Sequence, residues 1–397
     1  MKIPILLVVL LGSLSCAPTA LAQSPAGPTD ESAAKNGPPA PVAFVYVARP
    51  THLDAFAVAA NGALTPTPGA PFANLRLAAL VANQKYLVAL DDSGTSLHTF
   101  AIESNGSLNP VSTLNVKKYL PCIAGYADQT MLSMNTTSAD VYLVAEDCAY
   151  DNHLLSFKLE SNGDLGFLGA SNYVYSADTN FFSQPTFLSS DVYAYQVGCA
   201  YKDDTNEAQL TSYKRSSSGL LEFHEASNSP VPTPPASAGG IYCPIAAATG
   251  PSSHLAVVMG DVDNNGNYIG NTVLATYSAN SQGVLTTKST YENMPVVPDA
   301  WIAQALSISP SGKYLALAGD GIQIYHFNGS SPITHFVTAK LGAFFDEVAW
   351  DGSDHVYAHD PQNGFVHVFA VSSSGIKEAP GSPYSIPEST AITVVNR

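Results

Sequence analysis

Charged side chains are scarce in this sequence. They make up 12% of its 397 residues, and only 16 of them are basic, against 32 acidic ones. Long surface helices need many Lys, Glu and Arg residues, so this composition argues against a helical fold. The formal net charge of −16 also argues against nucleic acid or an anionic membrane surface as a partner.

Long apolar runs are missing after the N-terminus. No later stretch approaches about 18 uninterrupted apolar residues, so we expect no transmembrane segment. At the N-terminus, a short apolar stretch from Ile3 to Leu14 precedes Ala20-Leu21-Ala22, which predicts a signal peptide over 1–22, cleaved after Ala22. Lipidation of Cys16 is the alternative. Residues 23–41 form a flexible leader, and we expect a secreted or periplasmic protein.

Glycine (29), proline (28) and tyrosine (20) are plentiful, which favours strands joined by turns. One pattern recurs at intervals of roughly 40 to 60 residues, the period of propeller blades. It consists of a β-rich run, a polar loop, a second alternating run, and a turn with Gly followed by an apolar residue. The alternation predicts half-buried antiparallel strands. The seven copies begin at Phe44, Tyr86, Val141, Val192, His254, Tyr314 and His355.

Each blade needs an innermost strand ahead of this pattern. Small apolar segments occur there, and examples are Leu77–Ala82, Ile123–Tyr126, Ile245–Ala248 and Ala305–Ser309. The first copy follows the leader directly, whereas the last copy is followed by a spare strand, Thr390–Val395. The sequence therefore predicts an all-β fold over 42–397. It is a seven-bladed β-propeller of four-stranded antiparallel blades, with the ring closed by the C-terminal strand.

Several motifs resemble one propeller family. Pro68-Gly69-Ala70-Pro71-Phe72 and Pro380-Gly381-Ser382-Pro383-Tyr384 match its blade-ending element, and Ser309–Tyr314 matches its bend into the second strand. With the repeats, they make the chain similar to the seven-bladed lactonase-type propellers, which include a 6-phosphogluconolactonase and the carboxymuconate-cyclising enzymes. The resemblance covers nearly all of Phe44–Arg397. It implies catalysis by His, Glu and Arg side chains in the central mouth.

Candidate site residues lie in loops that open on the predicted mouth. Opening a lactone needs a general base and a donor or cation for the oxyanion. We expect Glu347 or Asp346 to be the base, with Arg76 nearby as the cation. The chain has only four arginines, too few at the mouth for a sugar phosphate, so we expect an uncharged or weakly charged substrate. The remaining ligand-binding candidates are Arg49, His52, Trp301 and Gln304.

Four cysteines remain after cleavage, and export would oxidise them. In blades of this geometry, Cys122 and Cys148 lie on one face of a single blade, while Cys199 and Cys243 lie on adjacent blades. Bridging needs Cα atoms within about 7 Å, so we predict Cys122–Cys148 and Cys199–Cys243. A Cys148–Cys199 bridge and four free thiols are the alternatives.

We expect the protein to need no cofactor, although it could bind calcium. The one metal-like loop is Asp261-Val262-Asp263-Asn264-Asn265-Gly266, whose oxygens at positions one, three and five could bind calcium through Asp261, Asp263 and Asn265. A polar hairpin tip is the alternative. The sequence has no Gly-x-Ser-x-Gly elbow, His-Glu-x-x-His motif or phosphate loop to support other hydrolases or a nucleotide enzyme.

Two functions follow from these patterns. The first is an exported, monomeric, lactonase-like hydrolase or isomerase acting on a small molecule. The second is a non-catalytic propeller that binds a glycan, a peptide or an envelope component through an acidic, tyrosine-rich face. The family resemblance favours the first function, and the shortage of basic residues favours the second.

Overall fold

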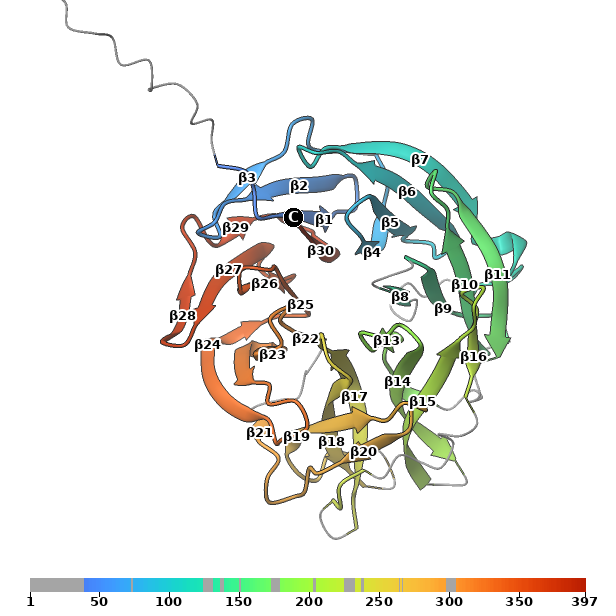
Figure 1. Cartoon of the computed structure of the whole chain (residues 1–397), viewed down its shortest axis with the longest axis vertical. Helices are drawn as coiled ribbons and strands as arrows, with labels where there is room; N and C mark the ends of the chain where they lie inside the picture. Colours follow the sequence, from blue (N-terminus) through green and yellow to red (C-terminus); the bar gives the residue numbers. More distant parts are fainter. Residues whose placement is uncertain are drawn as a thin grey trace, which may run out of the picture. The chain divides into compact units, whose positions relative to one another are not determined.

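The protein is a ring of β-sheets (Figure 1). The structure, a computed structural model, describes residues 39–397 apart from 73, 124–130, 136–138, 150, 173–178, 203–204, 225–232, 237–238, 264, 266 and 298–304. Seven antiparallel sheets surround a central axis as blades, which confirms the predicted propeller. The predicted signal peptide and most of the leader lie outside the described residues.

The first four blades use the following strands, given from the axis outward. Blade 1 has β30 (Ala391–Asn396), β1 (Ala43–Ala48), β2 (Leu53–Val58) and β3 (Leu64–Pro66); blade 2 has β4 (Leu77–Ala82), β5 (Tyr86–Asp91), β6 (Ser96–Ile102) and β7 (Leu108–Asn115); blade 3 has β8 (Met131–Met134), β9 (Val141–Glu146), β10 (Asn152–Leu159) and β11 (Leu165–Asn172); blade 4 has β12 (Thr179–Phe182) and β13 (Thr186–Phe187) side by side on β14 (Tyr193–Lys202), then β15 (Thr205–Arg215) and β16 (Leu221–Phe223).

The last three blades follow the same plan. Blade 5 has β17 (Ile241–Thr249), β18 (His254–Val262), β19 (Thr272–Ala279) and β20 (Leu285–Thr287), with β21 (Val296–Val297) also on β19; blade 6 has β22 (Ala305–Ile308), β23 (Tyr314–His326) and β24 (Thr334–Phe344); blade 7 has β25 (Glu347–Trp350), β26 (His355–Asp360), β27 (Phe365–Ser372) and β28 (Gly375–Glu378), with β29 (Tyr384–Ser385) also on β27. A 3₁₀ turn, η1 (Val116–Lys118), follows β7.

Blade 6 has two predicted strands within one element. The N–H of Phe327 donates to the Lys313 carbonyl at 2.8 Å, so the two ends of β23 lie side by side. β23 therefore folds back on itself and supplies both the second and third strands of this blade.

The C-terminal strand closes the ring as predicted. β30 pairs with β1 in antiparallel register from Ala43↔Asn396 to Ala48↔Ala391. In Figure 1, β30, in red, lies beside β1, in blue. Both ends of the described chain therefore lie in blade 1, and the pairing covers the edge of β1 that faces the axis.

The second strands are buried more completely than the sequence pattern predicted. β1 and β26 are buried at every residue rather than at every second one. Each blade packs against a neighbour on both of its faces. Phe44 and Tyr46 of β1, for example, share an apolar cluster with Leu87 of the next blade. Apolar runs such as Phe44–Ala48 therefore belong to sheets covered on both sides.

The predicted disulfides are confirmed. The Cα atoms are 5.5 Å apart in Cys122–Cys148 and 5.2 Å apart in Cys199–Cys243. The strands around the second bridge are longer than predicted, because β14 extends to Lys202 and β17 starts at Ile241. Cys199 therefore lies in a strand rather than in the loop after it.

The innermost strand of blade 3 was placed too early. The structure has it at β8, Met131–Met134, whereas the sequence pattern placed it at Ile123–Tyr126. Ile123 forms only an isolated bridge to Asp147, beside the Cys122–Cys148 disulfide, and residues 124–126 lie outside the described part of the chain.

Buried tyrosines connect neighbouring blades through their hydroxyl groups. Tyr195 of blade 4 donates to the carbonyl of Gly283 in blade 5 at 2.7 Å. Tyr142 of blade 3 makes the same contact with Gly219 of blade 4 at 2.8 Å. These carbonyls belong to the predicted Gly turns, where Gly283 has a φ of +76° that favours glycine. The turns therefore both end a hairpin and accept a bond from the blade before.

We expect Tyr195→Phe to lower the free energy of unfolding by about 1–3 kcal/mol, because it leaves the buried Gly283 carbonyl without its donor. Tyr277→Phe is a matched control, since the buried Tyr277 hydroxyl has no hydrogen-bond partner among the described residues. Urea unfolding of both variants measures the difference. Equal stabilities for the two variants would show that the contact contributes nothing.

Candidate functional site

A cavity of about 560 Å³ lies at the centre of the ring. Every blade contributes to its wall through its innermost strand or the residues beside it. The contributing segments are Ala78–Val81, Met131–Met134, Ser183–Phe187, Ile245–Ala247 with Thr249, Ala305–Ser307, Asp346–Val348 and Ile392–Thr393. The volume is that of a small-molecule site.

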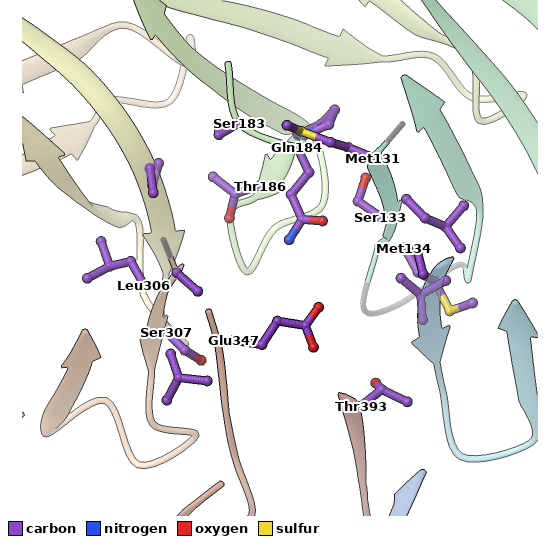
Figure 2. Close-up of a pocket in the computed structure, with 18 of the residues that line it drawn as sticks. Met131, Ser133, Met134, Ser183, Gln184, Thr186, Leu306, Ser307, Glu347 and Thr393 are labelled. Carbon is purple, nitrogen blue, oxygen red and sulfur yellow. The ribbon is translucent and has the colours of Figure 1, made fainter. Parts of the chain in front are cut away.

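Two polar side chains project furthest into this cavity. Figure 2 shows the Glu347 carboxylate of blade 7 and the Gln184 amide of blade 4 pointing into the same space. Ser133, Ser307 and Thr393 lie around them on other blades. The wall thus offers the carboxyl groups of Asp346 and Glu347, several neutral hydrogen-bonding groups and the apolar side chains between them.

The pKa of the Glu347 carboxyl group is shifted toward neutral pH. Burial raises the pKa of its carboxyl group to about 7, and nearby Asp346 adds to the rise, whereas His359 and a backbone N–H oppose it. That N–H belongs to Ile392 of β30 and donates to Glu347 Oε2 at 2.5 Å. A base is most effective when its pKa is close to the working pH.

A hydrogen-bonded chain lies behind Glu347. His359, at 0% exposure, faces Glu347 in the β25–β26 register. Its Nδ1 is 2.6 Å from Asp346 Oδ1, and its Nε2 is 2.6 Å from Ser389 Oγ. Burial works against a charged imidazole, but Asp346, with the charges of Glu347 and Asp360, outweighs burial and raises the pKa of His359.

The Asp346–His359–Ser389 order is that of a serine-hydrolase triad, but the geometry differs. A nucleophilic serine must be accessible and give its proton to histidine. Ser389 is only 6% exposed and does not line the cavity, and its hydroxyl donates to the Ile386 carbonyl at 2.9 Å. The accessible member is Asp346, whose side chain is 31% exposed. Ser389 therefore does not have the position of a nucleophile.

The structure brings together only some of the predicted site residues. Asp346 and Glu347 both line the cavity, as expected. Arg76 does not line it; its side chain is 70% exposed and pairs with Asp92 at 2.6 Å. Arg49 and His52 form a separate group after β1, with Nη1 and Nε2 3.2 Å apart. Trp301 and Gln304 lie outside the described residues.

Sequence reasoning missed three residues of this site, namely Gln184, His359 and Ser389. The sequence did carry a signal for Ser389, namely its position. It lies just before the closing strand β30, in the same way that Asp346 lies just before β25. His359 lies near the end of the second strand of the seventh copy, close to the loop that opens on the mouth. Gln184 lies in a blade whose inner strand has no clear apolar pattern, so no signal marked it.

The three predicted calcium ligands, Asp261, Asp263 and Asn265, do not all lie in one loop. Asp261 lies within β18 and is 2% exposed. Asp263 Oδ1 accepts the N–H groups of Asn265 at 2.8 Å and Asn267 at 2.9 Å. Among the residues that the structure describes, no group of three or more His, Cys, Asp or Glu could hold a metal ion.

Calcium binding by Asp261, Asp263 and Asn265 stays a prediction. It requires that millimolar calcium raise the melting temperature and that Asp263→Ala abolish the rise. Identical melting curves of the native protein in calcium and in a chelator would contradict it.

In the described part of the chain, no helix is long and apolar enough to cross a bilayer.

The protein is similar to known proteins in its fold. The sequence matches no protein-family model and no curated protein. Three solved structures are similar at 13% identity over 89% of this chain. They are candidate 6-phosphogluconolactonases from Bacteroides uniformis (TM-score 0.63, 99% of that chain) and Bacteroides fragilis (0.62, 98%), and the periplasmic gluconolactonase of Pseudomonas aeruginosa (0.62, 99%). The chain therefore has the fold of the 6-phosphogluconolactonase-like seven-bladed propellers.

Proposed function

We propose that the protein is an exported hydrolase of small, uncharged lactones that uses Glu347 as its general base. The observation that carries this proposal is the Glu347 carboxylate, which projects into the central cavity and has a pKa raised to about 7 by burial. An ordinary surface glutamate is a much weaker base at neutral pH.

The proposed reaction uses water as the nucleophile. Glu347 Oε2 accepts the Ile392 N–H, and the carboxylate takes a proton from a water molecule in the cavity. The hydroxide oxygen bonds to the lactone carbonyl carbon, and the ring C–O bond breaks. Protonated Glu347 then returns its proton to the leaving alkoxide, and the product is a hydroxy acid. The Gln184 amide and neighbouring hydroxyls can donate to the oxyanion.

The charge of the cavity supports a neutral substrate. Its described lining contains two carboxyl groups, Asp346 and Glu347, and no Lys or Arg. A phosphate group would meet repulsion here without a cation to bind it. The similar fold of a periplasmic gluconolactonase supports lactone chemistry, and the two disulfides support export.

A second candidate is a propeller that binds a glycan, a peptide or an envelope component without chemistry. The position of Arg76 favours it, because this arginine pairs with Asp92 and does not line the cavity. The proposed oxyanion would then have only neutral donors among the described lining residues.

A lactone panel decides between these functions. Purified protein is mixed with neutral lactones of five- to seven-membered rings and with a phosphorylated sugar lactone, and acid release is followed by pH-stat titration. Our proposal expects turnover of neutral lactones that exceeds turnover of the phosphorylated one. Absence of turnover across the panel would favour the binding function.

A further inference from the structure

His359 is enclosed by groups that fix the position of its protons. The side chain has 0% exposure, and each ring nitrogen has one short contact, Nδ1 with Asp346 Oδ1 and Nε2 with Ser389 Oγ, both at 2.6 Å. A buried imidazole has no water to supply or remove hydrogen bonds, so its partners determine its protonation.

The contacts at both ends accommodate a hydrogen on each ring nitrogen. An ionised carboxylate can only accept, so Nδ1 carries a hydrogen and donates it to Asp346. A serine hydroxyl has one hydrogen, and the Ile386 carbonyl, 2.9 Å from Ser389 Oγ, is an acceptor for it. With that hydrogen on the carbonyl, Ser389 Oγ accepts from Nε2–H at 2.6 Å. With hydrogens on both nitrogens, the His359 ring is a cation.

The surrounding charges agree with this arrangement. Three carboxyl groups contribute to the raised pKa of the ring: Asp346 before β25, Glu347 on β25 and, more weakly, Asp360 on β26. Glu347 is the residue directly opposite His359 in the antiparallel register. Side chains of such opposed residues lie on one face of the sheet with Cβ atoms about 4.5–5.5 Å apart.

We propose that His359 is a fixed imidazolium and a positioning residue, which keeps the Glu347 carboxylate ionised and aimed into the cavity without touching the ligand. The positioning role rests on the proposed function of Glu347, whereas the charge of His359 is argued from its two hydrogen-bond partners and the surrounding carboxyl groups. Asp346 and Ser389 hold the cation from opposite sides.

Nuclear magnetic resonance of the full chain with ¹⁵N-labelled histidine tests the charge. At pH 8, we expect both ring nitrogens of His359 to show the protonated signature. His98, whose pKa is lowered by burial, should be neutral in the same spectrum. The signal that disappears in His359→Gln identifies His359. A neutral tautomer of His359 at pH 8 would overturn the proposal.

Titration of Glu347 tests the positioning role. In His359→Gln, the ¹³C-carboxyl titration midpoint of Glu347 should rise by about 1–3 pH units, because an opposite charge is lost nearby. If His359→Gln does not fold, Ser389→Ala takes its place. Ser389→Ala should raise the titration midpoint of Glu347 and reduce the imidazolium fraction of His359. Ser389→Thr keeps the hydroxyl and should restore both values. An unchanged midpoint in a folded variant would overturn the role.

The two proposals can fail separately. A protonated His359 with a shifted Glu347, in a protein that hydrolyses no lactone, would refute only the proposed function. Lactone hydrolysis with a neutral His359 would refute only this inference.

Discussion

Glu347→Gln is expected to lower kcat/KM for lactone hydrolysis by about 100- to 10,000-fold, the contribution of a well-placed general base. Glutamine keeps the shape of the side chain and can still accept the Ile392 N–H, but it cannot take a proton from water. The measurement is initial-rate kinetics on the best neutral lactone of the panel.

The pH profile gives the same residue a second test. Only ionised Glu347 is a base, so the wild-type rate should rise with pH, with a midpoint near 7, where burial places the pKa of this carboxyl group. Glu378→Gln is the matched control, because Glu378 is in the same blade and contacts His367 at 2.9 Å without lining the cavity. A full rate in Glu347→Gln would place the base elsewhere.

A chain that ends at Thr390 should not fold cooperatively. It lacks β30, which makes six register pairs with β1 and buries Ala391, Ile392 and Val395. Full burial of each Ile or Val side chain contributes about 1.5–3 kcal/mol, and the loss also exposes a whole edge of β1. Thermal melting by circular dichroism and size-exclusion chromatography would report a broad transition and aggregates.

The control for this truncation ends at Asn396. It removes only Arg397, whose guanidinium lies over the Phe44 ring at 5.0 Å and donates to the Ser104 carbonyl. That cation–π contact contributes about 0.5–1 kcal/mol, so the melting curve should shift only slightly. A sharp, unshifted transition in the chain that ends at Thr390 would show that ring closure is dispensable.

The sequence predicted those features that repeat. Strand periodicity and Gly turns recur in every copy, so one pattern located seven blades, and the unmatched strand near residue 391 indicated closure. The disulfide pairing followed from the same blade geometry, because the loops before inner strands and those after second strands open on one face of the ring. Errors appeared where a copy departs from the pattern, as at β8 and β14.

The site was less predictable because its members come from separate parts of the chain. Asp346 and Glu347 were found from their place before an inner strand. Arg76 has the equivalent place but turns toward Asp92, and only the side-chain conformation decides between the two directions. The contact between His359 and Ser389 depends on ring closure, which no local window of sequence contains.

The pairing of β1 with β30 also determines how the ring responds to mechanical force. Ala43 faces Asn396, so the two ends of the chain leave this strand pair at the same point. Force applied between the termini would load the hydrogen bonds one after another, as in opening a zipper, rather than all together in shear. The ring would therefore open at a low force. Force applied through attachments at both termini would separate β30 from β1 and move Ile392 away from Glu347.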